Sequence, residues 1–158
     1  KNVFSFRLAA SDTKQKLPLY ISKDNRGDNR LYSTNQKRNS ITVECLTIDE
    51  LLKENKIENL DLIKIDVQGY EPKVLKGMRK IVKSSKELIL LSEFWPKGIL
   101  QAGENPKEFL AMLRKMQFQL FELKRNGSLI LIKPCDDYKF IKKYRGRKYT
   151  NIIGKKLN

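Results

Sequence analysis

The chain has 158 residues, of which 40% are hydrophobic, and a formal net charge of +15. This length predicts one domain, and no stretch approaches the ~18 consecutive apolar residues that a transmembrane helix requires. The absence of histidine excludes the commonest general base and zinc ligand, so acid–base chemistry here must use Asp, Glu, Lys or Tyr.

The first third of the sequence predicts three strands and a long loop. Val3 to Ala10 and Leu17 to Ser22 are typical of strands joined by a polar turn, and Ile41 to Leu46 predicts another strand. The polar segment from Asp24 to Ser40 predicts a loop whose length favours a functional role. Thr47 and Glu50 then form the signature of a capping box, which predicts a short helix.

The middle of the chain predicts an α/β sheet. Leu60 to Val67 is almost continuously apolar, which is typical of a central parallel strand. A helix is predicted from Tyr70 to about Ile81, with Pro72 in its first turn. Glu87 to Phe94 predicts a second buried strand, and Asn105 with Pro106 marks the start of another helix.

An antiparallel hairpin is expected next, because Asn126-Gly127 separates two apolar segments, Phe118 to Leu123 and Leu129 to Lys133. The predicted fold is therefore an open α/β sheet with helices on both faces and an antiparallel edge. From Lys133 to Asn158 nine Lys or Arg residues stand against two Asp. We expect residues 134–158 to be a loosely attached basic tail, either simply solvated or in contact with an anionic partner.

Three acids and a lysine suggest a functional site. Asp66 ends the first buried strand and Glu93 ends the second, so in neighbouring strands they would lie about 4.8 Å apart. Lys64, two residues before Asp66, should point to the same face. Glu71 begins the following helix, where an acid equally serves to bind free backbone amides.

Five segments of the sequence carry a family resemblance. "LIKIDVQGYEPKVLKG" resembles the hallmark segment of the FkbM-type methyltransferases. "LLSEFWPKGILQAG", "YISKDNRGDNRLY", "LAASD" and "TVECLTIDELL" are similar to other segments of that family. The resemblance covers about Val3 to Ile132, and the order and spacing of the segments make it specific.

The resemblance implies a Rossmann-like class I methyltransferase sheet that transfers a methyl group from S-adenosylmethionine to an oxygen nucleophile. The acceptor would be a hydroxyl of a small molecule, a glycan or a lipid in the cytoplasm, and no metal is assigned. The implied roles are catalysis by Asp66, Glu93 and Lys64, cofactor binding by Ser11, Asp12, Asp66 and Val67, and substrate binding by Asn25, Asp28, Arg30, Glu71 and Trp95.

The sequence departs from the family in one respect. Its eight glycines contain no G-x-G cluster of the kind that holds the cofactor. The chain is therefore expected to be the carboxyl-terminal part, residues 1–133, of a truncated methyltransferase domain. Alone it should bind S-adenosylmethionine weakly and self-associate through an exposed sheet edge. The alternative is a non-enzymatic basic module that contacts nucleic acid or a partner chain.

Overall fold

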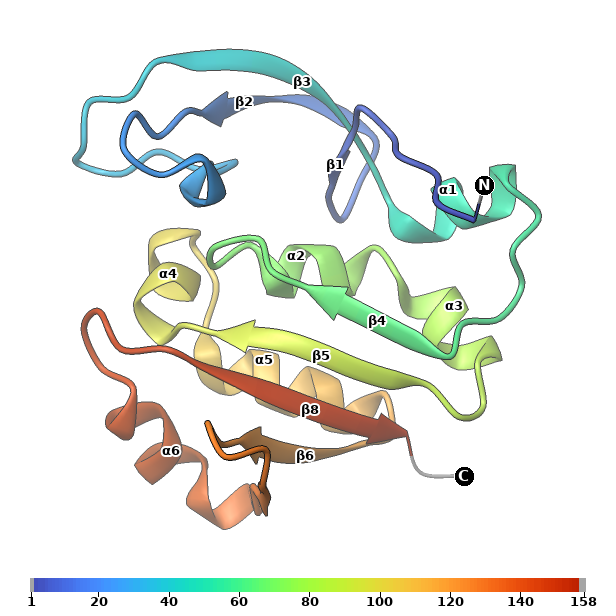
Figure 1. The fold of residues 1–158 in the computed structure, drawn as a ribbon, viewed down its shortest axis with the longest axis vertical. Coiled ribbons are helices and arrows are strands. Elements are labelled where there is room, and N and C mark those ends of the chain that lie inside the picture. The colour runs from blue at the N-terminus through green and yellow to red at the C-terminus, as the bar shows by residue number, and fades with distance from the viewer. Residues whose placement is uncertain (1, 157–158) are drawn as a thin grey trace.

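The computed structural model describes residues 2–156, which form two β-sheets and the helices that pack against them (Figure 1). The smaller sheet contains β1 (Ala9–Ala10), β2 (Gln15–Tyr20) and β3 (Ser40–Leu46) in the order β1-β3-β2. The strand predicted over residues 3–10 is reduced to β1, and Val3 and Phe4 are exposed and pair with no strand within residues 2–156. The loop between β2 and β3 contains the short 3₁₀ helix η1 (Arg26–Asp28).

The larger sheet has the strand order β4-β5-β8-β6-β7. Its strands are β4 (Leu62–Ile65), β5 (Ile89–Phe94), β6 (Phe118–Leu123), β7 (Leu129–Leu131) and β8 (Thr150–Lys156). β4 and β5 are parallel neighbours and β6 and β7 form an antiparallel pair, both as predicted. The prediction that β4 is central is wrong, because within residues 2–156 it pairs only with β5 and so lies at the sheet edge.

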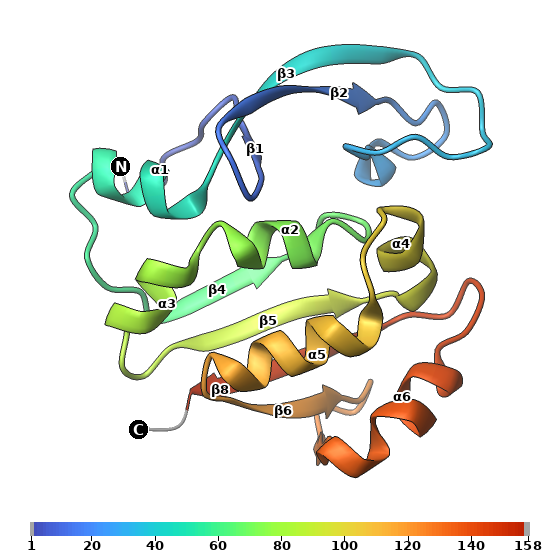
Figure 2. The same ribbon diagram turned by 180° about the vertical axis from the view of Figure 1, so that it is seen from behind.

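Helices cover one face of the larger sheet. α2 (Glu71–Lys76), α3 (Arg79–Ser84) and α5 (Pro106–Lys115) lie together on that face, as Figure 2 shows. The opposite face carries the exposed side chains of Leu62, Lys64 and Ile89. The prediction of helices on both faces is therefore wrong for residues 2–156, and Lys64 is exposed rather than buried because nothing in this range covers it.

The predicted caps define several helix starts. Thr47 forms a complete capping box with Glu50 at the start of α1 (Ile48–Glu54), and Asn105 caps α5 just before Pro106. The helix predicted to reach Ile81 is instead two helices, α2 and α3. It breaks at Gly77, where an added Cβ would lie 2.1 Å from the Ser11 carbonyl oxygen. The Asp49 carboxylate then accepts hydrogen bonds from backbone amides in the first turn of α3.

The predicted tail is part of the fold, so the expectation of loose attachment is wrong. After η2 (Pro134–Asp136) and α6 (Asp137–Lys143), β8 pairs with both β5 and β6. Phe140 stacks on Phe94 with ring centroids 5.1 Å apart, and Tyr144 and Lys143 bind the buried Glu122 carboxylate. Charge dominates this segment's composition, but the few apolar side chains decide its position by packing into the core.

Aliphatic and aromatic side chains between the larger sheet and its helices form the core, including the fully buried Leu75, Phe94, Leu110 and Ile152. α4 (Pro96–Gln101) follows β5 and closes the end of the sheet at which β4 and β5 finish. None of the helices within residues 2–156 is long and apolar enough to cross a membrane.

Candidate functional site

Two parallel strands bring the predicted acids together. In the β4–β5 register Ile65 lies opposite Ser92, so Asp66 and Glu93 follow at the same edge of the sheet. Neighbouring strands are about 4.8 Å apart, which sets the separation of these two backbones. The prediction that the strands carrying Asp66 and Glu93 are neighbours is confirmed.

A tight turn after β4 adds a third acid, Glu71. Gln68 and Gly69 both have positive φ angles, 56° and 101°. An added Cβ on Gly69 would lie 2.3 Å from the carbonyl carbon of Gly98, so only glycine allows the turn to approach α4 this closely. The Glu71 carboxylate then reaches back and accepts a hydrogen bond of 3.0 Å from the Val67 amide.

Glu71 and Glu93 are buried, with 0% and 9% of their surface exposed. In each carboxyl group one oxygen, Oε2, has no hydrogen-bond partner among the residues that the structure describes. Burial raises the pKa of Glu71 to about 7, against the opposing effect of its backbone hydrogen bonds. Burial and the charges of Glu71 and Asp66 likewise raise the pKa of Glu93 to about 7.

Asp66 has a different environment from the other two acids. Its side chain is 43% exposed and lies 3.1 Å from the Lys64 ammonium group. The Gln68 amide donates a further hydrogen bond of 3.2 Å. The site therefore combines one solvated carboxylate with two buried carboxyls that gain and lose protons near neutral pH.

The loop between β2 and β3 is attached to this site through Arg30 and Tyr32. The Arg30 guanidinium lies 4.9 Å from the centroid of the Trp95 ring and 5.8 Å from that of Tyr32. The Tyr32 hydroxyl donates a hydrogen bond to the Gln68 carbonyl oxygen in the turn after β4. Burial raises the pKa of Tyr32 to about 12, so it is a neutral hydrogen-bond donor at physiological pH.

Asp28 orders the same loop by pairing with two arginines. One carboxylate oxygen lies 2.6 Å from Arg30 and the other 2.6 Å from Arg38. Asn25 accepts a hydrogen bond of 2.9 Å from the Gly27 amide and so caps η1. Tyr32 and Arg38 were not among the predicted site residues. The sequence signal that could have identified Tyr32 as a site residue is its position in the polar segment that was predicted to be a functional loop.

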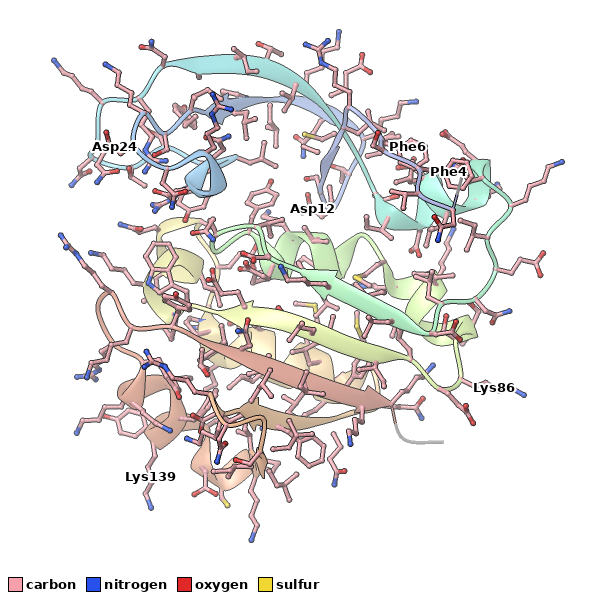
Figure 3. The ribbon with its side chains drawn as sticks, viewed as in Figure 1. Phe4, Phe6, Asp12, Asp24, Lys86 and Lys139 are labelled. Atoms are coloured by element: carbon pink, nitrogen blue, oxygen red, sulfur yellow. The ribbon has the colours of Figure 1, made fainter. Side chains whose placement is uncertain are left out.

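Asp12 lies between the smaller sheet and α2, as Figure 3 shows, and Ser11 precedes it. Ser11 is fully buried, and its hydroxyl is 3.4 Å from the hydroxyl of Tyr70, the residue before Glu71. Asp12 lies 3.2 Å from the Lys73 ammonium group. Partial burial opposes its ionisation, but Lys73 lowers the pKa of Asp12 below its usual value. Within residues 2–156 no hydrogen bond or ion pair joins Ser11 or Asp12 to Asp66 or Glu93.

The site contains carboxyl groups, the cations Lys64 and Arg30, and aromatic rings. No group of three or more potential metal-ligating side chains occurs in the part of the chain that the structure describes. The arrangement can accept a proton at a buried carboxylate and hold a ligand against Trp95.

Comparison with known proteins identifies relatives of this chain. A hexuronic acid methyltransferase, AglP, from Haloferax volcanii is 27% identical over 100 residues, which are 62% of this chain and 38% of the relative. The match thus spans well under half of the relative's length. No solved structure matches. Residues 3–123 match the family described as the methyltransferase FkbM domain, and this match covers most of the chain. The chain therefore belongs to the FkbM methyltransferase family.

Proposed function

We propose that this chain supplies the acid-bearing part of an S-adenosylmethionine-dependent O-methyltransferase site. The observation that carries the proposal is the pair of buried carboxyls, Glu93 near the end of β5 and Glu71 at the start of α2, after the turn that follows β4. Each retains an oxygen without a partner among the described residues, and each has a pKa of about 7. Buried carboxyls with such pKa values are suited to proton transfer near neutral pH.

The residues present suit one end of S-adenosylmethionine. Carboxylates favour a cationic sulfonium, and Asp66 and Glu71 would lie on that side. Ser11 and Asp12 are proposed for the adenine side, together with Val67 near the methionine moiety. When bound, the cofactor supplies an electrophilic methyl group. No G-x-G cluster occurs in the sequence to hold its amino-acid end.

Glu93 is proposed as the general base. Its unpartnered Oε2 would accept the proton of the acceptor hydroxyl, and burial strengthens its basicity by disfavouring the ionised form. Lys64 and Arg30 act in the opposite direction, since their positive charges lower the pKa of Glu93. These two cations would keep a useful fraction of Glu93 ionised at neutral pH.

The acceptor is proposed to be a sugar-like hydroxyl compound. Trp95 offers an aromatic surface beside Glu93, and Arg30 holds that ring from the loop side. The relative from Haloferax volcanii is named for methylation of a hexuronic acid, which supports a glycan acceptor. The hydrogen bond from Trp95 Nε1 to the Gly146 carbonyl, 3.1 Å long, would fix the ring plane.

Transfer of a labelled methyl group from S-adenosylmethionine to a hexuronic acid glycan tests the proposal. We expect Glu93→Gln in the full-length protein to reduce kcat by ~10²–10⁴-fold. Glu87→Gln is the matched control, because Glu87 is an exposed acid on the same chain segment. Equal rates for both variants would show that Glu93 is not the base.

A further inference from the structure

A pocket of about 470 Å³ lies between α3 and α5, away from the acid cluster. Both helices are on the same face of the larger sheet (Figure 2). Lys156 lines the pocket, and its backbone amide bonds to the Leu88 carbonyl just before β5 begins. Glu93 is five residues further along, so the pocket and the acids are separated by roughly 16 Å of strand.

The floor of the pocket is apolar and adaptable. It includes Val82 from α3 and Met112 and Met116 from α5. Val82 is buried, and both methionines are half-buried. Unbranched methionine side chains can change rotamer to fit a flexible chain. The volume is also within the ~300–1,000 Å³ range of small-ligand pockets.

The rim of the pocket is cationic. Arg79 and Lys83 on α3 and Lys115 on α5 are exposed there, and none of the described lining residues is acidic. No ion pair within residues 2–156 involves any of these three side chains. Some other cations of the chain do have an acidic partner, as where Lys76 lies 2.8 Å from Glu104. The rim therefore has an uncompensated positive charge that favours an anion.

The wall formed by α3 is fixed in place. The Lys156 ammonium group donates hydrogen bonds to the carbonyl oxygens of Ser85, at 2.7 Å, and Lys83, at 3.2 Å. These bonds tie the carboxyl end of α3 to the last described strand, β8. The Lys156 ammonium group therefore interacts with the carbonyl oxygens at the end of α3, whereas the three rim cations remain available to a ligand.

We propose that this pocket binds a single-chain amphipathic phosphate. The alkyl chain lies against Val82, Met112 and Met116, and the phosphate group lies among Arg79, Lys83 and Lys115. The apolar floor matches the alkyl chain of such a ligand, and the cationic rim matches its phosphate group. A purely apolar ligand would leave the rim unused, and a simple anion would leave the floor unused. The site is independent of the proposed methyl transfer.

Titration with dodecyl phosphate below its micelle concentration tests the proposal, with ¹³C-methyl methionine NMR as the readout. The chain has three methionines, and the fully buried Met78 serves as the internal reference. We expect saturable shifts of Met112 and Met116 that weaken at high salt. Inorganic phosphate and dodecyltrimethylammonium should leave these signals unchanged. Equal shifts with either control compound would overturn the proposal.

The double variant Lys83→Gln with Lys115→Gln should weaken dodecyl phosphate binding about tenfold, which is ~1.4 kcal/mol. Its matched control, Lys139→Gln with Lys142→Gln, removes two exposed charges from α6 and should bind as the unaltered protein does. Circular dichroism verifies that both variants are folded. Equal affinity of the two folded variants, or the absence of binding by the unaltered protein, would refute the assignment.

Discussion

Replacing Gly69 by alanine should destabilise the turn that carries the acid cluster. At φ 101° an L side chain is strained, which costs ~1–2 kcal/mol. The new Cβ would also lie 2.3 Å from the carbonyl carbon and 2.5 Å from the carbonyl oxygen of Gly98. Both atoms belong to the backbone, so no side chain can rotate away, and overpacking adds ~1–3 kcal/mol. The total loss in the free energy of unfolding is therefore ~2–5 kcal/mol.

Gly103→Ala is the matched control for this experiment. Gly103 has a φ of 80°, but an added Cβ there meets no atom within 4 Å, so only the conformational cost applies. Urea unfolding followed by circular dichroism gives both free energies, and we expect Gly69→Ala to lose ~1–3 kcal/mol more than Gly103→Ala. Equal losses would show that the approach of Gly69 to Gly98 does not determine the stability of this turn.

Four further experiments address the acids and the sheet edge. Because the pKa of Glu71 is raised from 4.5 to about 7, the folded state holds a proton that the unfolded state loses, so stability should fall between pH 4.5 and 7 and then level off. Glu71→Gln should remove the contribution of Glu71, about 3 kcal/mol at pH 8, and leave that of Glu93, so the variant's stability should fall less with pH; parallel pH profiles of urea unfolding for the variant and the unaltered protein would contradict this. The methylation rate of the full-length protein should rise with pH around an apparent pKa near 7, as Glu93 ionises, and a flat profile would count against that base. Asp66→Asn should abolish methyl transfer while circular dichroism shows an intact fold. Unchanged turnover would show that Asp66 has only a structural role, through its contacts with Lys64 and Gln68. Leu62→Lys, on the edge strand β4, whose outer side has no partner strand within residues 2–156, should reduce self-association in sedimentation velocity, and an unchanged oligomer distribution would place the contact elsewhere.

Local sequence signals determined most element types and helix starts. These signals depend only on residues close in the sequence, which supply a hydrogen-bond acceptor or a glycine that tolerates a positive φ. They are Thr47 with Glu50, Asn105 with Pro106, and Asn126 with Gly127. The parallel β4–β5 pair also followed from two apolar segments joined by a helical connection. The neighbouring positions of Asp66 and Glu93 were predicted from this pairing alone.

Only the tertiary structure decided which faces and edges are covered. Lys64 is exposed and β4 is an edge strand because these properties depend on which other elements pack there, and no local pattern encodes that. Within the basic segment, β8 was placed between β5 and β6 by a few buried side chains such as Ile152, whose strand partners Ser92 and Glu122 are 60 and 30 residues away. The raised pKa values of Glu71 and Glu93 have the same origin. Their side chains are ordinary in sequence, and burial by distant segments removes the water that would otherwise stabilise their charge.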